Sequence, residues 1–293
     1  MSEPVAAPVP APTETAAPTS GLDGSRVPGT LDQAFRLSRY QFRDYLRSRR
    51  FVLMIGIVVA IGAILSLVLY HFHGAGLSGS ADAFYGTLWA GAAPYVIVFA
   101  GIIFGGDAIA GEFQNKTGYF LMGLPIRRTS VYVGKYVAAF LASTISLLLF
   151  LAIVVGNGVV YLGVGSVNGA LLVSLGIALL YLAALLGAVF LFSSMFKNSL
   201  YAVLVVAVLF LFGFRIIQDV VVGLVHMEPW FLISYTNIVI SYPFGSIPAH
   251  IQHSATNGTT YNPYYWEGIV IMLGYAVLTA LGGLAFFERE EFT

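Results

Sequence analysis

The sequence contains no cysteine among its 293 residues, which excludes disulfide frameworks, thiolate metal sites and cysteine nucleophiles. Charged residues are also scarce: they make up 10% of the chain, whereas a soluble domain typically carries about 25%. Hydrophobic residues reach 58%, and the mean hydropathy is +0.84. This balance indicates a polytopic membrane protein, and the formal net charge of zero provides no field that would attract nucleic acid.

Two sequence patterns are missing as well. No segment matches G-x-x-x-x-G-K-[ST], the loop that cradles nucleotide phosphates, so we expect this chain to bind no ATP and no other cofactor. No basic segment followed by an apolar core precedes the first long apolar run, so we expect no cleavable signal peptide. Residues 1–30 are rich in Pro, Ala and Thr and bury too little apolar area to offset their ordering entropy, which predicts a disordered tail.

Six apolar segments are each long enough to cross about 30 Å of hydrocarbon as a helix. Their continuous runs favour helices over the alternating pattern of a membrane β-barrel. The predicted fold class is therefore all-α, a polytopic bundle of six transmembrane helices within residues 51–293. The predicted spans are 51–72, 88–106, 132–155, 168–192, 199–222 and 267–287.

Lysine and arginine are absent from every second connection between these spans. The loops 73–87, 156–167 and 223–266 contain neither residue, whereas the other connections and the segment before the first span are basic. By the positive-inside rule, we expect a multi-pass protein of the cell membrane with both termini in the cytoplasm.

Residues 31–50 combine six arginines with an apolar stripe at helical spacing. This pattern is typical of an amphipathic helix in the headgroup layer, with its basic face on anionic lipid. The alternative is that the arginines serve only as topology signals. The interfacial residues that we single out are Phe35, Arg39, Phe42, Arg43 and Arg47, and the stripe is Leu31, Phe35, Ser38, Phe42, Tyr45 and Leu46.

A polar segment, residues 107–135, separates the second and third predicted spans and is far longer than a turn requires. We expect a short helix that ends at Pro125, because proline disfavours helical geometry in the residue before it. Thr129 or Ser130 is expected to cap the next helix, and Gly134 to allow close approach of another backbone. Such a hairpin suits docking of a soluble partner; a solvated loop with topology charges is the alternative.

The order of residues in this hairpin resembles that of ABC-2 type transporter permeases. The family pattern runs as Glu, a Gly-Thr pair, a Leu-rich stretch, Pro-hydrophobic-x-Arg and Gly-Lys. In this chain the pair is reversed, which leaves the role of Gly118 open. The matching residues are Glu112, Thr117-Gly118, Leu121, Leu124-Pro125-Ile126, Arg127 or Arg128, and Gly134-Lys135.

This resemblance implies an export permease that works by alternating access as a homodimer or heterodimer. Each subunit would engage a separate ATP-hydrolysing subunit, which would bind the ATP and Mg²⁺. A membrane-embedded, metal-dependent enzyme and a non-catalytic membrane scaffold remain the competing functions. The coupling positions implied by the resemblance are Glu112, Thr117, Gly118, Leu121, Pro125, Arg127, Arg128 and Lys135.

Arg215 and Asp219 lie one helical turn apart within the fifth predicted span. Arginine at mid-bilayer costs about 2.5–3.5 kcal/mol, but a straight helix from Ser199 would carry Arg215 roughly 24 Å along its axis, into the outer leaflet. We expect the two side chains to pair. The alternative is that they line a substrate path.

All five histidines fall on the predicted outer side. Imidazoles two or three residues apart can bind Zn²⁺ or Cu²⁺, but no cysteine or acidic cluster accompanies them, and we assign no metal site. The segment 223–266, rich in aromatic residues and interrupted by four prolines, is expected to form short interfacial or re-entrant helices, as an exit gate or as an aromatic belt alone. Asn257 begins a glycosylation sequon. The histidines are His71, His73, His226, His250 and His253.

Overall fold

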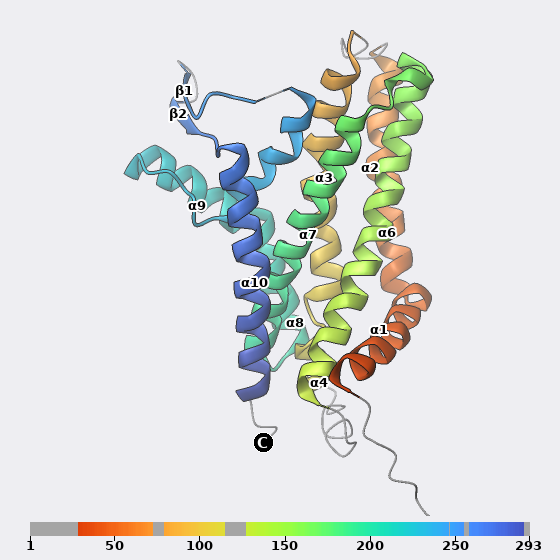
Figure 1. Ribbon diagram of the computed structural model, residues 1–293, viewed down its shortest axis with the longest axis vertical. Coiled ribbons are helices and arrows are strands. Elements are labelled where there is room, and N and C mark those ends of the chain that lie inside the picture. Colours follow the sequence, from red (N-terminus) through yellow and green to blue (C-terminus); the bar gives the residue numbers. More distant parts are fainter. Residues whose placement is uncertain (1–28, 73–78, 115–126, 246, 255–257, 290–293) are drawn as a thin grey trace, which may run out of the picture.

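The structure is a computed structural model that describes residues 29–72, 79–114, 127–245, 247–254 and 258–289 (Figure 1). Six helices within these residues are long and apolar enough to cross a membrane. The prediction of an all-α, polytopic bundle is therefore confirmed. The tail 1–28 and the sequon residue Asn257 lie outside the described residues.

Most of the spanning helices are longer than the apolar runs from which they were predicted. A helix can continue through polar residues at its ends, and these residues lie outside the apolar run that hydropathy detects. At the second span, Ser80 Oγ accepts a hydrogen bond of 3.1 Å from the N–H of Ala83, so the helix begins at Ala81 rather than at residue 88. The spans are α2 (Arg49–His71), α3 (Ala81–Gly105), α6 (Arg128–Leu162), α7 (Gly169–Met195), the bent series α8 (Ser199–Val208), η2 (Leu209–Gly213), α9 (Phe214–Val220) and η3 (Val221–Val225), and α10 (Tyr265–Arg289).

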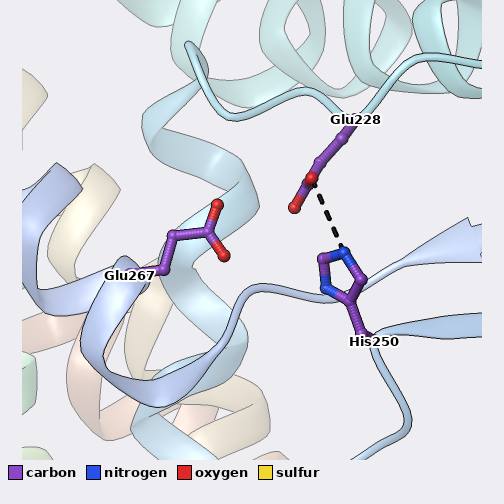
Figure 2. A group of neighbouring side chains, drawn as sticks. All are labelled: Glu228, His250 and Glu267. Carbon is purple, nitrogen blue, oxygen red and sulfur yellow. Dashed lines mark ion pairs between the residues drawn. The ribbon is translucent and has the colours of Figure 1, made fainter.

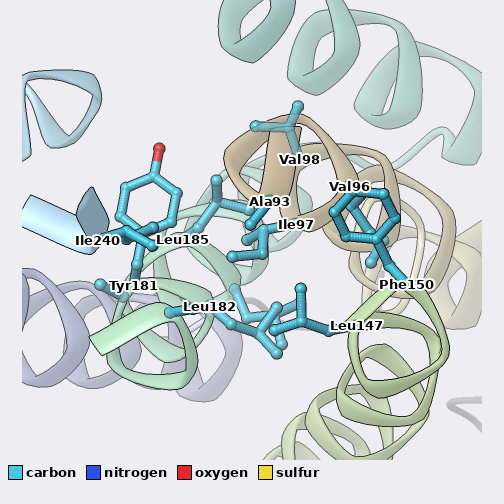
Figure 3. Close-up of a cluster of buried hydrophobic side chains, with 14 of the residues drawn as sticks. Ala93, Val96, Ile97, Val98, Leu147, Phe150, Tyr181, Leu182, Leu185 and Ile240 are labelled. Carbon is cyan, nitrogen blue, oxygen red and sulfur yellow. The ribbon is translucent and has the colours of Figure 1, made fainter. Parts of the chain in front are cut away.

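Helices α3, α6 and α7 form the core of the bundle. Their facing side chains are fully or almost fully buried and include Ile97 of α3, Leu147 of α6 and Leu182 of α7 (Figure 3). Trp89 of α3 stacks on Phe150 of α6 with ring centroids 5.9 Å apart. Both rings have no exposed surface, so this layer fixes α3 against α6.

Helix α1 (Thr30–Arg47) lies obliquely across one end of the bundle, where α10 also ends (Figure 1). We call this end, with α1, α4 (Ala110–Gln114) and the last turn of α10, the terminal end. The predicted boundary of the basic helix at residue 50 is wrong. Ser48 has extended backbone and accepts a hydrogen bond of 3.3 Å from the N–H of Phe51, so it caps α2, and Arg49 and Arg50 belong to α2.

The opposite end, which we call the loop end, carries the connection between the fifth and sixth spans. This connection contains a 3₁₀-helix, η4 (Ile233–Phe244), packed against α3, α7 and α10, and an antiparallel hairpin of β1 (Ile251–Ser254) and β2 (Gly258–Tyr261). A short 3₁₀-turn, η1 (Val164–Ser166), joins α6 to α7 at the same end. The hairpin was no part of the sequence prediction, because its strands are short and polar.

The fifth span is not straight, so the straight helix that we assumed in placing Arg215 along the span is wrong. In η2 the N–H of Phe214 bonds to the carbonyl of Leu209, five residues back, and η3 is a second π-helical turn. Such turns bend a helix at the inserted residue. As a result α9 leans out of the bundle, almost across its long axis, near the loop end (Figure 1).

A buried relay of hydrogen bonds ties η4 to the core. Trp89 Nε1 donates to Ser174 Oγ of α7 over 2.9 Å, and Ser174 Oγ donates to the carbonyl of Ile240 over 2.6 Å. Ser174 has no exposed surface. Its hydroxyl therefore satisfies one buried donor and one buried acceptor at once.

Ser174→Ala should lower the free energy of unfolding by about 1–3 kcal/mol, because it leaves the indole N–H and the Ile240 carbonyl without a partner. The measurement is thermal and denaturant unfolding of the purified chain in detergent. Ser143→Ala is the matched control: the Ser143 hydroxyl is equally buried and makes no hydrogen bond, so its loss should be neutral or stabilising. Equal stability of the two variants would contradict the relay.

Candidate functional site

Positive charge collects at the terminal end. In the part of the chain that the structure describes, every Lys and Arg apart from Arg215 lies in α1, near the start of α2 or α6, between α7 and α8, or in the last turn of α10. The sequence alternation that led to the positive-inside expectation therefore corresponds to one end of the folded bundle. At the loop end, the charged side chains of the described residues, apart from Arg215, are carboxylates.

Helix α1 packs directly on α6 where Gly134 leaves room for it. A Cβ atom at position 134 would lie 3.0 Å from the Cβ of Leu37 and 3.1 Å from the carbonyl oxygen of Ala34, so a side chain there would push α1 away. The prediction that Gly134 permits a close backbone approach agrees with this geometry. The backbone that approaches belongs to α1.

Polar contacts fasten the first turn of α1 to the first turn of α6. Arg127 donates from its N–H to Gln33 Oε1 over 3.2 Å and from its guanidinium to Thr30 Oγ1 over 3.0 Å, and Ser130 Oγ donates to the carbonyl of Thr30 over 3.0 Å. The predicted cap at Thr129 or Ser130 is wrong. Helix α6 begins at Arg128 without a side-chain cap, because both hydroxyls bond to other elements.

Lys135 joins the two legs of the segment 107–135. It projects from α6 with only 7% of its surface exposed, and its ammonium donates to the carbonyl of Ala108 over 2.8 Å and to the carboxylate of Glu112 in α4. The Glu112 side chain is 17% exposed. A buried charge needs such partners, so this ion pair fixes the position of α4 against α6.

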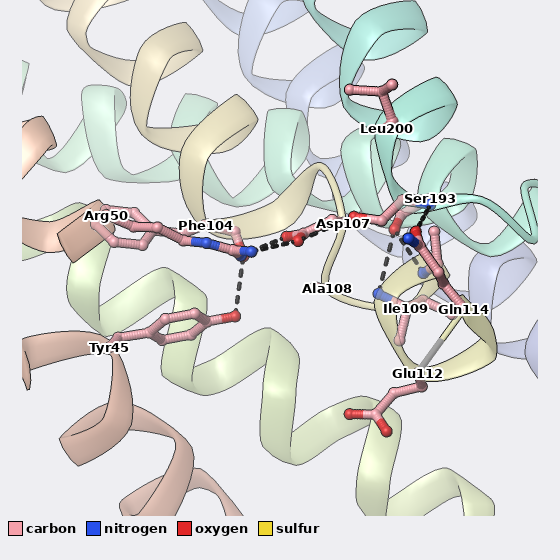
Figure 4. A network of polar contacts seen from close by, with 12 residues as sticks. Tyr45, Arg50, Phe104, Asp107, Ala108, Ile109, Glu112, Gln114, Ser193 and Leu200 are labelled. Carbon is pink, nitrogen blue, oxygen red and sulfur yellow. Dashed lines mark hydrogen bonds and ion pairs between the residues drawn. The ribbon is translucent and has the colours of Figure 1, made fainter. Parts of the chain in front are cut away.

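A second ion pair connects α2 to the end of α3. The Arg50 guanidinium donates two hydrogen bonds of 2.6 Å to the carboxylate of Asp107, and Ser199 Oγ at the start of α8 donates to the same carboxylate over 3.1 Å (Figure 4). The bidentate geometry sets both distance and orientation. Three spans are therefore fixed at one carboxylate.

Tyr45 connects α1 to the end of α3. Its hydroxyl donates to the carbonyl of Phe104 over 2.9 Å. Burial, together with the negative charge of Asp107, raises the pKa of the Tyr45 hydroxyl well above its ordinary value, which keeps the donor protonated. Next to this contact, Ser193 Oγ accepts from the N–H groups of Ile109 and Ala110, each over 3.2 Å, and so fixes the first turn of α4 (Figure 4).

The other hairpin residues fall into two groups. Arg128 donates to the carbonyl of Glu288 over 3.0 Å, and Thr129 Oγ1 donates to the carboxylate of Glu288 over 2.7 Å, so α6 is tied to the last turn of α10. The remaining predicted coupling positions lie outside the described residues. These are Thr117, Gly118, Leu121 and Pro125.

The predicted apolar stripe of α1 is partly buried in the protein and partly exposed on its surface. Ser38 and Tyr45 turn into the protein, whereas Phe35 is 72% exposed and Phe42 is half-buried. The arginines predicted for the interface, Arg39, Arg43 and Arg47, are exposed. A cavity of about 570 Å³ along this face is lined by Asp32, Phe35, Arg36, Arg39, Tyr40 and Arg43.

Arg215 and Asp219 form the expected pair on α9, with Nε and Oδ2 3.5 Å apart. Both side chains are mostly exposed on the surface of the chain. They also line a polar cavity of about 690 Å³ between α9, η4 and β2, together with Gln218, Asn237 and Asn262.

Sequence reasoning missed two clusters. The bidentate pair of Arg50 with Asp107 joins residues 57 positions apart, whereas the sequence analysis placed Arg50 in the interfacial helix without a partner. At the loop end, Glu228 and Glu267 come together with His250, although the sequence offered no acidic cluster around the histidines. Both sets of partners are brought together by the tertiary fold.

Lys135→Met should lower the free energy of unfolding by about 3–5 kcal/mol, because it removes the ammonium from a carboxylate that stays mostly buried. Unfolding of the purified chain in detergent measures the loss, and Lys135→Met combined with Glu112→Leu should recover most of it. Lys197→Met, an exposed lysine at the same end, is the control and should have little effect. A loss equal to that of the control would contradict the structural role of the pair.

The comparison with known proteins gives one result of substance. The family model described as "ABC-2 family transporter protein" matches residues 36–292, nearly all of the chain. No curated protein matches it. The chain belongs to the ABC-2 transporter family, whose members form the membrane permease of ABC transporters.

Proposed function

We propose that this permease exports its substrate by alternating access and is driven by a separate ATPase subunit docked at the terminal end. The ATPase supplies the sites for ATP and Mg²⁺, and two permease subunits, identical or different, form the transport pathway. The terminal end faces the cytoplasm of the cell, and α1 lies in the inner headgroup layer with its arginines on anionic lipid.

The observation that supports this proposal most is the linkage of α1, α4 and the first turns of α6 into one body. Gly134 brings α1 against α6, Lys135 ties α4 to α6, and Arg127 ties the hairpin exit to Thr30. A partner that pushes on the hairpin therefore moves all three elements together. A solvated loop that carried only topology charges would need none of these contacts.

A movement of the linked body at the terminal end can be transmitted to the loop end through continuous helices. Helix α6 contains 35 residues, which gives it a length of roughly 52 Å. The Arg50–Asp107 pair couples α2, α3 and α8 to the same body, and Glu288 couples α10. We infer that these contacts let a push at the terminal end rock whole helices and open the loop end.

We further propose that the substrate leaves past Arg215 and Asp219. Their cavity is polar, opens near the loop end and is lined by amide and hydroxyl groups, which suits a substrate with polar groups. Charged side chains at membrane depth commonly mark such pathways.

Replacing Arg127 and Arg128 by Glu should abolish co-purification of the ATPase subunit and reduce its stimulated hydrolysis by at least tenfold. Charge reversal breaks the contacts to Thr30 and Glu288 that hold the linked body together, and it inverts the charge that this end presents to a partner. The measurement is affinity co-purification from the native membrane followed by an ATPase assay. Lys197→Glu, at the same end but outside the linked body, is the control.

A complex that stayed intact and active in the Arg127, Arg128 double variant would refute the docking site. Co-purification also separates the competing functions. A metal-dependent enzyme or a scaffold would bring down no ATPase and stimulate no hydrolysis.

The absence of cysteine makes the orientation directly measurable. A single cysteine at Arg127 should react with a membrane-impermeant maleimide only after the cells are opened, whereas one at Tyr264 should react in intact cells. Both positions are exposed, at opposite ends of the bundle. Labelling of Arg127→Cys in intact cells would overturn the cytoplasmic assignment.

A further inference from the structure

Three side chains with metal-ligating atoms converge at the loop end from three separate parts of the chain. Glu228 follows η3, His250 precedes β1, and Glu267 lies in the first turn of α10 (Figure 2). One ligand atom from each lies within 4.8 Å of the other two, and all three residues are partly buried. Figure 2 shows both carboxylates and the imidazole pointing towards a common centre.

The imidazole of His250 is oriented for ligation. Its Nδ1 lies 2.7 Å from the carbonyl oxygen of Asn262, so Nδ1 carries a hydrogen, and Nε2 faces the carboxylate of Glu228. The ring stacks on Tyr264 with centroids 4.4 Å apart, and Asn262, itself 4% exposed, donates to the backbone carbonyls of His250 and Ala249. A carbonyl that holds the distal nitrogen is the usual second shell of a metal-bound histidine.

The two carboxylates are also held. Glu228 accepts a hydrogen bond from the hydroxyl of Tyr235 through Oε1, which leaves Oε2 facing His250, and Glu267 accepts from the N–H of Tyr264 over 3.0 Å. The segment 223–266 contains no Lys or Arg, and the basic side chain that faces Glu228 is His250.

The distances suit a shared ion better than a direct contact. His250 Nε2 and Glu228 Oε2 are 3.7 Å apart, too far for a hydrogen bond. Two ligands on one tetrahedral Zn²⁺ stand about 3.3 Å apart, given Zn–N and Zn–O lengths near 2.0 Å. Small side-chain rotations would therefore bring one ligand atom each of Glu228, His250 and Glu267 to coordination distance from a shared Zn²⁺. The fourth coordination position of the ion would be open to water.

We propose that Glu228, His250 and Glu267 form a binding site for a divalent transition metal, with Zn²⁺ as the best match to one imidazole and two carboxylates. The ion would fasten the end of the fifth span to the start of the sixth and to the hairpin between them. This site lies at the opposite end of the bundle from the proposed ATPase contact. Its existence does not depend on that contact.

The test is Zn²⁺ binding to the full-length chain, purified in detergent without a polyhistidine tag. Equilibrium dialysis with metal analysis should give one tightly held Zn²⁺ per chain, which a tenfold excess of Ca²⁺ does not displace. His250→Asn, Glu228→Gln and Glu267→Gln should each weaken binding by at least about tenfold, and Zn²⁺ should raise the melting temperature of the wild type alone among these four.

His226→Asn is the matched control, because His226 is an exposed histidine of the same end and Asn tolerates its left-handed backbone, with φ of 54°. It should bind as the wild type does. Glu228→Gln keeps the size of the side chain, so it still tests the site if His250→Asn does not fold. Displacement by Ca²⁺, failure of the wild type to retain Zn²⁺, or unchanged affinity in His250→Asn and Glu228→Gln would each overturn the site.

Discussion

Lys135 carries a positive charge into the interior of the terminal end, and the surrounding elements are arranged to satisfy it. The ammonium requires the Ala108 carbonyl and the Glu112 carboxylate, and both come from the stretch where α3 has ended and α4 begins. This requirement draws the chain back against α6 directly after it has left the second span. Gly134, one residue earlier, lets α1 occupy the neighbouring groove. One buried charge thus organises the end of the molecule at which we propose that the ATPase docks.

Local patterns predicted much of this fold. Long apolar runs gave the six spans, because crossing hydrocarbon imposes a minimum length that hydropathy reports. Helix ends were predicted less well, since Ser80 and Ser48 set them through single hydrogen bonds that hydropathy does not contain. The bend of the fifth span was missed for the same reason. In the π-turn, the N–H of Phe214 bonds to the carbonyl of Leu209, five residues back instead of four, and the amino-acid composition of the span does not reveal this change.

The coupling role of the motif residues stays a prediction, and their contacts were not predicted. Lys135 contacts Glu112 and Ala108, and Gly134 lies against α1. Each of these partners lies far away in the sequence. Arg50 was assigned to the basic face of the interfacial helix, although it lies in α2 and forms a bidentate pair with Asp107. The Glu228, His250 and Glu267 cluster gave no signal, because its members are separated by intervening strands and a 3₁₀-helix. Pairings set by packing cannot be read from spacing.

The tilt of α9 has a consequence for the lipid around the subunit. The fifth span contains 27 residues, which as a straight helix would measure roughly 40 Å, yet its second half runs almost sideways (Figure 1). The apolar band on this flank is therefore shorter than on the flank of α2. Lipid adapts to a short apolar band by thinning. We therefore expect headgroups and water to reach towards Arg215 on this flank, so that the membrane presents a thinner hydrocarbon layer there than beside α2.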